Sequence, residues 1–383
     1  MFMVWSENTR CGVSIPWRMY PRSVLYMLSL LGRFMICNEL YNEQGLGNQL
    51  WNYALTRIIA KRNGCEFSIL KAERFKGKDF MDIDFGTPLS GGQTSKRGYL
   101  FKLPNGIKYY YSERRELLGA TLSDMSDDIS RTDPHLLNLS PYTKFDGNCQ
   151  STKYLDGYRS DILKWISIKD TYKKYQPEPN ICLIHLRLGD FMQSKAFLPI
   201  QYYKQAMEYI KSLDPSVTFQ CITDQKEIAQ KLFPEVIMVG SALSDTTDTH
   251  NALHHHGGPI GIDFCLLMHA TYLIIPNSSF SWWAAYLNTV KKAVVAPKYW
   301  GRYNMHDGLW SPSDIITDGF TYLDKNGKTF SSSECWIEKT DFEKTHEHMF
   351  NSNNNLNKPW KKHRYLLSAY ISFLLKKLRA KFL

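Results

Sequence analysis

The sequence predicts an α/β protein with two Rossmann-like domains that face a cleft. Short apolar runs alternate with helix-like stretches, and this alternation is typical of β/α units with parallel strands. The chain has 383 residues and a hydrophobic content of 43%, which is enough for one or two substantial cores and favours two domains. Residues 169–180 hold two prolines and several charges, so we expect the linker there.

The expected elements follow one another along the chain. An apolar run at 34–37 predicts a first strand, and a helix-like stretch follows it as far as Lys61. Further strands are expected at 181–184, 219–222, 236–239, 271–275 and 293–296, with helices at 200–213 and 226–232. From about Ser90 to Ser151 no period is sustained, which indicates loops and short strands over a cleft. That composition suits an acceptor-recognition surface, and it suits irregular surface loops equally well.

A serine-rich segment, PNSSFSWWAAYLN at 276–288, directly follows one of these apolar runs. It predicts a strand that leads through Asn277, Ser278 and Ser279 into an aromatic helix. The first amides of a helix are unpaired and its dipole favours negative charge, so this arrangement is typical of an anion pocket. The same residues also fit a plain N-cap on a core helix whose tryptophans simply pack.

A second polar group follows the apolar run at 181–184. His185, Arg187 and Asp190 come at the carboxyl end of the predicted strand, where open α/β sheets bind their ligands. A guanidinium carries a fixed fork of donors that matches a phosphate and stays charged at any working pH. Alternatively, Arg187 pairs with Asp190, and His185 is a hydrogen-bonded residue of the core.

A glycine-containing turn, QGLGNQLWNYA at 44–54, opens the first predicted helix. Gly45 and Gly47 allow the backbone to come close to a bound group, and the helix start beyond them faces an anion. The turn is not a dinucleotide fingerprint, because Leu50 stands where that pattern needs a third glycine or an alanine.

Together, the three segments resemble the alpha-1,2-fucosyltransferase family, glycosyltransferase family 11. GLGNQ at 45–49 is similar to the opening segment of the family, HLRLGDF at 185–191 to its HxRRGDY motif, and the serine block to its most specific motif. Weaker similarities lie at 219–224, 263–268 and 297–300. The resemblance therefore spans roughly residues 34–301. Leu188 stands where the family has a second arginine, and Gln225 where it has a second acidic residue.

This resemblance implies a GT-B-like glycosyltransferase architecture and an inverting transfer of L-fucose. The donor would be GDP-fucose, and the acceptor the 2-hydroxyl of a β-galactoside in a galactose-terminated oligosaccharide or a lipid-linked glycan. No essential metal or other cofactor is implied. Arg187 and Asp190 would be the catalytic residues. The donor would be bound by Gly45, Gly47, Asn48, His185, Asp224, Asn277, Ser278 and Ser279.

On this basis we expect four regions in the chain. Residues 1–32 precede the resemblance and form an N-terminal extension. Residues 33–174 are the expected acceptor-side α/β domain, and residues 175–340 the expected GDP-sugar-binding α/β domain. Residues 341–383 comprise an Asn-rich spacer and a basic amphipathic tail.

The net charge of +10 belongs mainly to that tail. Residues 358–383 contain six lysines, two arginines and no acidic residue, so residues 1–357 carry only +2. This distribution argues against a nucleic-acid-binding body, which is basic over its own surface. The apolar run 365–375 is too short to cross a bilayer, but its basic flanks favour an interfacial helix on anionic lipid. A helix docked on the catalytic body is the alternative.

The eight cysteines include no CxxC pair, and four of them fall within apolar runs, so we expect reduced thiols. Four histidines at 250 and 254–256 lack the spacing of a defined metal site. Neither terminal region contains a transmembrane-length apolar run, which favours a cytoplasmic enzyme peripheral to the inner membrane. Two alternatives remain: a GT-B-like transferase of another GDP-sugar or linkage, and a non-catalytic membrane- or nucleic-acid-binding protein.

Overall fold

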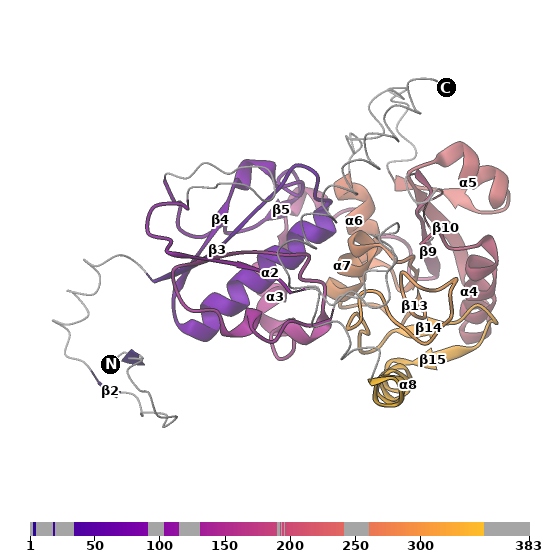
Figure 1. Cartoon of the computed structure of the whole chain (residues 1–383). Coiled ribbons are helices and arrows are strands. Elements are labelled where there is room, and N and C mark those ends of the chain that lie inside the picture. Colours follow the sequence, from indigo (N-terminus) through magenta and orange to yellow (C-terminus); the bar gives the residue numbers. More distant parts are fainter. Residues whose placement is uncertain are drawn as a thin grey trace, which may run out of the picture.

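The computed structural model describes residues 34–90, 103–114, 131–189, 192, 194, 196–240 and 260–347. It also gives the backbone of a short antiparallel pair, β1 (Met3–Val4) and β2 (Arg18–Met19). Asp190, the histidines at 250 and 254–256, and the basic tail lie outside the described residues. Figure 1 shows two α/β halves side by side, each with a parallel sheet, so the predicted fold class is confirmed.

The N-terminal domain contains a four-stranded parallel sheet. Its order is β4 (Glu66–Leu70), β3 (Met35–Glu39), β7 (Thr143–Asp146) and β6 (Tyr109–Ser112). Helix α2 (Leu46–Asn63) follows β3 as expected. It ends at Gly64, whose φ of 59° is the left-handed conformation that suits a helix C-terminus. Both β6 and β7 come from the stretch in which the sequence shows no sustained period.

Short elements complete this half of the molecule. Strand β5 (Met81–Asp82) pairs in antiparallel fashion with β8 (Ser167–Ile168). Among the residues described in this half, one further α-helix is present, α3 (Arg159–Trp165). The 3-10 turns are η1 (Ala72–Arg74), η3 (Leu136–Asn138), η4 (Thr152–Tyr154) and η5 (Asp170–Tyr172).

The C-terminal domain is built on a seven-stranded sheet. Its order is β11 (Ile237–Met238), β10 (Thr218–Thr223), β9 (Ile181–Leu186), β12 (Tyr272–Ile274), β13 (Ala293–Pro297), β14 (Thr321–Leu323) and β15 (Thr329–Ser331). All neighbours are parallel except β14 and β15. The helices are α4 (Ile200–Leu213), α5 (Lys226–Leu232), α6 (Ile260–His269), α7 (Ser279–Leu287) and α8 (Ser332–Thr345). The strands and helices expected in this half are therefore confirmed, with β11 shorter than its apolar run.

The strand order reverses at β9. After β9 the chain adds β10 and β11 on one side of it, and then returns to place β12 on the other side. In open α/β sheets, ligands bind outside the carboxyl ends of the strands at such a switch point. The residues that directly follow β9 and β12 therefore lie where a ligand crevice is expected.

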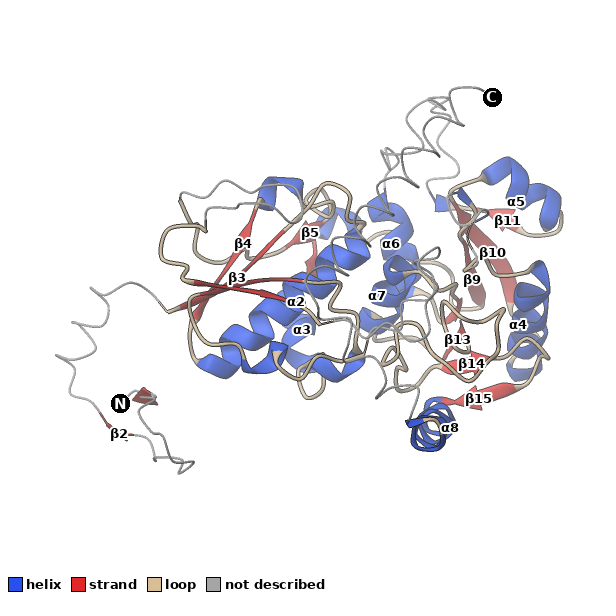
Figure 2. Cartoon of the chain, in the orientation of Figure 1, coloured by secondary structure: helices blue, strands red, loops and turns tan. Residues whose placement is uncertain are grey.

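One hydrophobic core runs through both domains. It joins Ile36 of the first sheet to Leu273 of the second by way of α2, α6 and α7, which lie between the two sheets in Figure 2. Trp51 of α2 stacks on Trp282 of α7 with ring centroids 4.3 Å apart, and both side chains are fully buried. This contact places the first turns of α2 and α7 next to each other.

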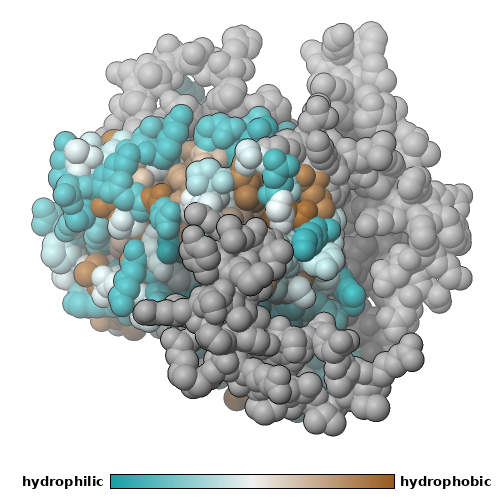
Figure 3. Space-filling view, turned by 90° about the vertical axis from the view of Figure 1, so that its left-hand side faces the viewer, coloured by the Kyte–Doolittle hydropathy of each residue, from teal (hydrophilic) through white to brown (hydrophobic). Residues whose placement is uncertain are grey.

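The outer surfaces are more polar. The described part of the N-terminal face in Figure 3 is mostly hydrophilic, with small hydrophobic patches. Among the described residues, no helix is both long and apolar enough to cross a bilayer. The seven cysteines of the described residues are free thiols, and six of them are buried.

Candidate functional site

Arg187 lies just beyond the end of β9 and forms an ion pair with Asp224, which follows β10. The distance from Arg187 Nη1 to Asp224 Oδ2 is 2.7 Å, and both side chains are partly exposed. The other carboxylate oxygen, Oδ1, accepts the backbone N–H of Leu188 at 2.9 Å. The pairing follows from the register, because Thr223 and Leu186 are partners in the parallel ladder one residue earlier. Asp224 therefore holds the guanidinium at the switch point.

The start of α7 lies at the same edge of the sheet. Ser278 is the N-cap residue of α7, but its side chain makes no capping hydrogen bond. The first amides of the helix thus lack a side-chain acceptor at the cap, and the helix dipole adds partial positive charge. Asn277, which is 8% exposed, donates from Nδ2 to the carbonyl of Ala196, while its buried Oδ1 has no partner in the described structure.

His185 is a buried residue of β9, and its ring lies 5.8 Å from that of Phe280 in α7. Burial and the nearby charge of Arg187 lower its pKa to about 3, so the imidazole is neutral at physiological pH. Its Nδ1 finds no hydrogen-bond partner among the described residues. A buried polar atom without a partner carries a free-energy cost, which a bound ligand or water relieves. His185 and Asn277 thus bring two such atoms to the ends of neighbouring strands.

The glycine-containing turn meets the serine block directly. A Cβ atom on Gly47 would lie 2.4 Å from the carbonyl carbon of Ser279, so only glycine allows this approach. Asn48 Oδ1 accepts hydrogen bonds from Ser279 Oγ at 2.9 Å and from Gln150 Nε2 at 2.8 Å. Gly45 is the N-cap of α2, and a Cβ placed on it meets nothing within 4 Å. The predicted residues Gly47, Asn48 and Ser279 therefore form the junction between the domains.

A buried charge cluster at the carboxyl edge of the N-terminal sheet was not predicted from the sequence. Lys144 of β7 lies 3.1 Å from Glu39 of β3 and 3.0 Å from Asp146, and Tyr41 donates to Asp146 at 3.0 Å. Burial opposes the charge of Lys144, but the two carboxylates outweigh it and raise the pKa of the ammonium. The chain then leads from Asp146 to Gln150, which bonds to Asn48. The cluster and the α2 start thus share one edge of the sheet.

The two positions that depart from the family motifs have clear locations. Leu188 is fully buried in the core between the C-terminal sheet and α4, so the site holds an aliphatic side chain packed away from solvent. Gln225 caps the start of α5 without a side-chain hydrogen bond to that helix. Asp190, the second predicted catalytic residue, lies outside the described residues, and its role stays a prediction.

Sequence comparison assigns the family. The model of Glycosyl transferase family 11 matches residues 127–323, just over half of the chain. The chain belongs to glycosyl transferase family 11. The matched region of this family 11 member contains Arg187, Asp224 and the serine block, which agrees with the predicted family assignment. The glycine-containing turn lies before the matched region and is bonded to it through Asn48 and Ser279.

Two curated relatives come from Escherichia coli. The O-antigen biosynthesis glycosyltransferase WbnK is 27% identical over an alignment of 172 residues, and the match covers 39% of this chain and 53% of the relative. An alpha-1,2-colitosyltransferase is 27% identical over an alignment of 128 residues, and the match covers 32% of this chain and 41% of the relative. The family 11 chain thus spans about half the length of the curated relatives it matches. Among solved structures, the fucosyltransferase NodZ from Bradyrhizobium is similar at 15% identity and a TM-score of 0.38, over 68% of this chain and 95% of NodZ.

Proposed function

We propose that this family 11 member is an inverting glycosyltransferase that moves L-fucose from GDP-fucose to the 2-hydroxyl of a β-galactoside. The proposal rests on the position of Arg187, which Asp224 holds at the switch point. This position is beside the start of α7, where the N-cap side chain makes no capping hydrogen bond. A guanidinium and helix amides are suited to the charged oxygens of a diphosphate. Family membership supports glycosyl transfer, and the alpha-1,2 linkage in the name of one relative supports the 2-hydroxyl.

In the proposed reaction the bond between the anomeric carbon and the β-phosphate oxygen breaks, and negative charge accumulates on the departing GDP. Donors that are already in place where charge develops lower the barrier most, since they need no reorganisation. Arg187 is fixed in this way by an ion pair and by its position after a fully buried strand. Ser278 and the first amides of α7 would complete the pocket for the diphosphate.

His185 and Asp224 would lie beside the guanosine in this proposal. His185 is neutral and buried, so it offers hydrogen bonds without adding charge to the pocket. Asp224 already accepts two hydrogen-bond donors, and it would act both on the nucleotide and on Arg187. Gly45, Gly47 and Asn48 would border the donor from the N-terminal domain.

Inversion requires the acceptor hydroxyl to approach from the side opposite the departing diphosphate. With the diphosphate at the start of α7, the carboxyl edge of the N-terminal sheet would lie on that side, because Asn48 of α2 is hydrogen-bonded to Ser279 of α7. The buried cluster of Glu39, Lys144 and Asp146 lies on this edge. We therefore place the galactose-terminated oligosaccharide or lipid-linked glycan against the N-terminal domain.

One relative favours a second candidate, transfer of another sugar with the same linkage. The alpha-1,2-colitosyltransferase is similar over 128 residues, and its name keeps the linkage while changing the sugar. Arg187 and the α7 amides would contact the diphosphate, so they do not distinguish one donor sugar from another. This candidate therefore differs from the first only in the donor sugar.

The proposal includes an environment for the reaction. No essential metal is expected, because Arg187 and the α7 amides supply the positive charge that a divalent cation otherwise provides. The basic tail would hold the enzyme on an anionic membrane surface, peripheral to the inner membrane on its cytoplasmic side. The O-antigen biosynthesis named for one relative is consistent with a glycan acceptor.

A donor screen separates these candidates. The protein is incubated with a panel of GDP-sugars and simple β-galactosides, and the linkage of each product is determined by NMR. Transfer of fucose to the 2-hydroxyl supports the proposal. Transfer of only a different sugar supports the second candidate, and donor binding without any transfer contradicts both.

A further inference from the structure

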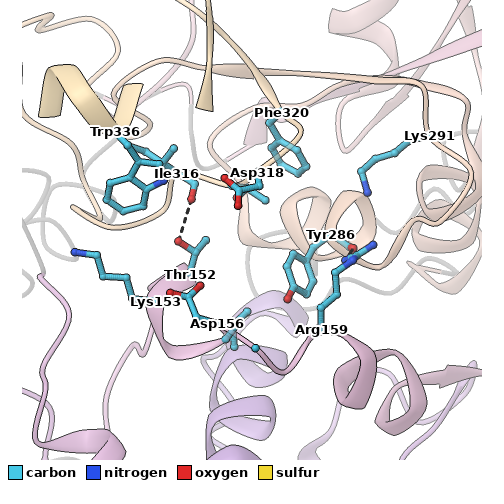
Figure 4. A pocket seen from close by; sticks show the side chains of 13 residues that line it. Thr152, Lys153, Asp156, Arg159, Tyr286, Lys291, Ile316, Asp318, Phe320 and Trp336 are labelled. Atoms are coloured by element: carbon cyan, nitrogen blue, oxygen red, sulfur yellow. Dashed lines mark hydrogen bonds between the residues drawn. The ribbon is translucent and has the colours of Figure 1, made fainter. Parts of the chain in front are cut away.

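A cavity of about 540 Å³ lies between the domains at the far end of α7 from the Arg187 site. Figure 4 shows that Asp156 and Arg159 border it from the N-terminal domain, and Tyr286, Asp318 and Trp336 from the C-terminal domain. Ser279 is the first residue of α7 and Tyr286 is the last but one. The cavity is therefore roughly 10 Å along the helix axis from the proposed donor pocket. The cavity is therefore separate from that pocket.

Cationic donors line one side of the cavity, at the carboxyl end of α7. Arg159 donates to the carbonyls of Tyr286 and Asn288, and its guanidinium lies 4.9 Å from the centre of the Tyr286 ring. Lys291 Nζ donates to the Asn288 carbonyl at 2.7 Å, and burial together with the charge of Arg159 lowers its pKa to about 8. Both side chains are anchored by carbonyls of the helix end, where cations are favoured. Both groups therefore bring positive charge to the wall of the cavity.

Two carboxylates also line the cavity, one from each domain. Asp156 and Asp318 each precede a glycine with positive φ, Gly157 at 80° and Gly319 at 79°, so two Asp-Gly turns carry them from different domains. In Figure 4 the two carboxylates lie on facing walls of the cavity. Burial and the charge of Asp318 raise the pKa of Asp156, while Lys153 acts in the opposite direction. Hydroxyl donors between the two carboxylates would offset this repulsion.

Aromatic rings complete the lining. Trp336 of α8 is partly buried, with Lys153 Nζ lying 5.1 Å from its ring centre. Phe320 is buried and also lines the cavity, with Asp318 between the two rings in Figure 4. The cavity thus combines aromatic surface with charged donors and charged acceptors. An anion would be repelled by the carboxylates, a cation by Arg159 and Lys291, and a purely apolar ligand would leave these groups without partners. A neutral ligand rich in hydroxyl groups both donates and accepts, and its C–H faces pack on aromatic rings.

We propose that this cavity is a second glycan-binding site, which holds a neutral segment of the acceptor away from the sugar that reacts. The inference rests on the proposed function, since it takes the acceptor to be a glycan. A glycan bound at two places meets the reaction site at a raised effective concentration. The site therefore favours long acceptors over short ones, without any contact to the donor.

The test compares a β-galactose-terminated disaccharide with a longer oligosaccharide that has the same terminus. In Trp336→Ala and Asp318→Asn, KM for the long acceptor should rise about tenfold or more, while kcat and KM for the disaccharide stay unchanged. The matched control is Ile337→Ala, because Ile337 is the neighbour of Trp336 on α8 and is 62% exposed. This variant should leave kcat and KM unchanged for both acceptors. Two outcomes would overturn the proposal. One is an equal rise of KM for both acceptors, and the other is an unchanged KM for the long acceptor in Asp318→Asn, where the replaced side chain is exposed.

A binding measurement separates this inference from the proposed function. Saturation-transfer NMR of the long oligosaccharide on the intact protein without donor should show contacts along its inner sugars, and these should be lost in Asp318→Asn. Binding of this kind in a protein that transfers no sugar would contradict the proposed function and leave the second site standing. Transfer activity without such contacts would support the proposed function and contradict the second site.

Discussion

Arg187 and Asp224 come from neighbouring parallel strands and are joined by an ion pair of 2.7 Å between Nη1 and Oδ2. Asp224 also accepts the N–H of Leu188, so one carboxylate fixes both the guanidinium and the turn that follows β9. Gly189 lies against the Asp224 carboxylate, because a Cβ placed on Gly189 would lie 2.6 Å from Asp224 Oδ2. The position of Arg187 is therefore set by a residue 37 positions further along the chain.

Replacing Arg187 tests whether it stabilises the departing diphosphate. We expect Arg187→Ala to lower turnover by ~10²-fold or more, the scale of losing a charge contact made in the transition state, while the fold persists. Arg187→Lys should recover only part of the activity, since a point charge does not reproduce the fork of donors. Arg131, which pairs with Glu343 at 3.4 Å, provides the control Arg131→Ala. Steady-state kinetics with circular dichroism check this, and normal turnover in Arg187→Ala would refute the assignment.

The approach of α2 to α7 predicts different outcomes for two glycines. Gly47→Ala should destabilise the protein by about 1–3 kcal/mol, because its Cβ would lie 2.4 Å from the carbonyl carbon of Ser279 and the helices must separate. Gly45→Ala is the matched control, since nothing lies within 4 Å of its Cβ. Denaturant unfolding of both variants measures the difference. Equal stabilities would mean that the two helices are not held as closely as described.

Asp314 predicts a stability difference that depends on pH. Burial alone would raise its pKa, but Lys339 and Lys153, each 3.1 Å away, together with Thr132 lower it to about 2. A carboxylate whose pKa is lower in the folded than in the unfolded protein stabilises the fold at pH values above its unfolded pKa, about 4. This stabilisation is lost as the pH falls towards the folded pKa, about 2. Asp314→Asn should therefore lower the free energy of unfolding by about 2 kcal/mol at pH 7, and by progressively less below about pH 4.

Urea unfolding at several pH values checks this prediction for Asp314. The control is Asp170→Asn, because Asp170 pairs with Lys173 at 2.6 Å but its side chain is 92% exposed. Exposed ion pairs contribute little to stability, so this variant should match the unmodified chain. A cost at Asp314 that is independent of pH would point to packing instead of charge.

The chelator experiment tests the absence of an essential metal. If Arg187 and the α7 amides neutralise the diphosphate, activity should persist in excess EDTA after dialysis. Among the described residues no cluster of histidine, cysteine, aspartate or glutamate has the grouping of a metal site. A loss of activity that only Mg²⁺ or Mn²⁺ restores would show that the phosphate pocket is incomplete without a cation.

Residues 358–383 predict membrane binding from their sequence. They carry +8, and each basic residue near an anionic surface contributes ~1 kcal/mol before screening. A chain truncated after Asn357 should no longer sediment with anionic vesicles, while its activity on a soluble acceptor persists. Zwitterionic vesicles and added salt provide the controls. A truncated protein that is insoluble or inactive would show that the segment is a docked helix.

The sequence allowed most of the C-terminal domain to be predicted, because its strands are continuous apolar runs bounded by turn residues. Strands β6 and β7 fall in the stretch where loops and short strands were expected, but their positions were not predicted, since YYYS and TKFD contain no such run. Lys144 of β7 is buried because two carboxylates pair with it. The pairing of Arg187 with Asp224 was also missed. Sequence spacing offered Asp190, which lies outside the described residues, whereas strand pairing brings Asp224 to Arg187, and spacing does not reveal such pairing. The glycines were predicted to bring the backbone close to a bound group, whereas in the structure the close approach of Gly47 is to the backbone of Ser279.

The shared core of the two domains has a consequence for recombination. Trp51 packs between Trp282 and Trp283, with centroids 4.3 and 5.1 Å away, so each half supplies part of the interior of the other. Interfaces between separable domains are more polar than this buried tryptophan contact. A chimera that joins this C-terminal domain to the N-terminal domain of another family member would expose mismatched tryptophan surfaces. Exchanging one domain therefore requires α2 and α7 to be exchanged as a pair.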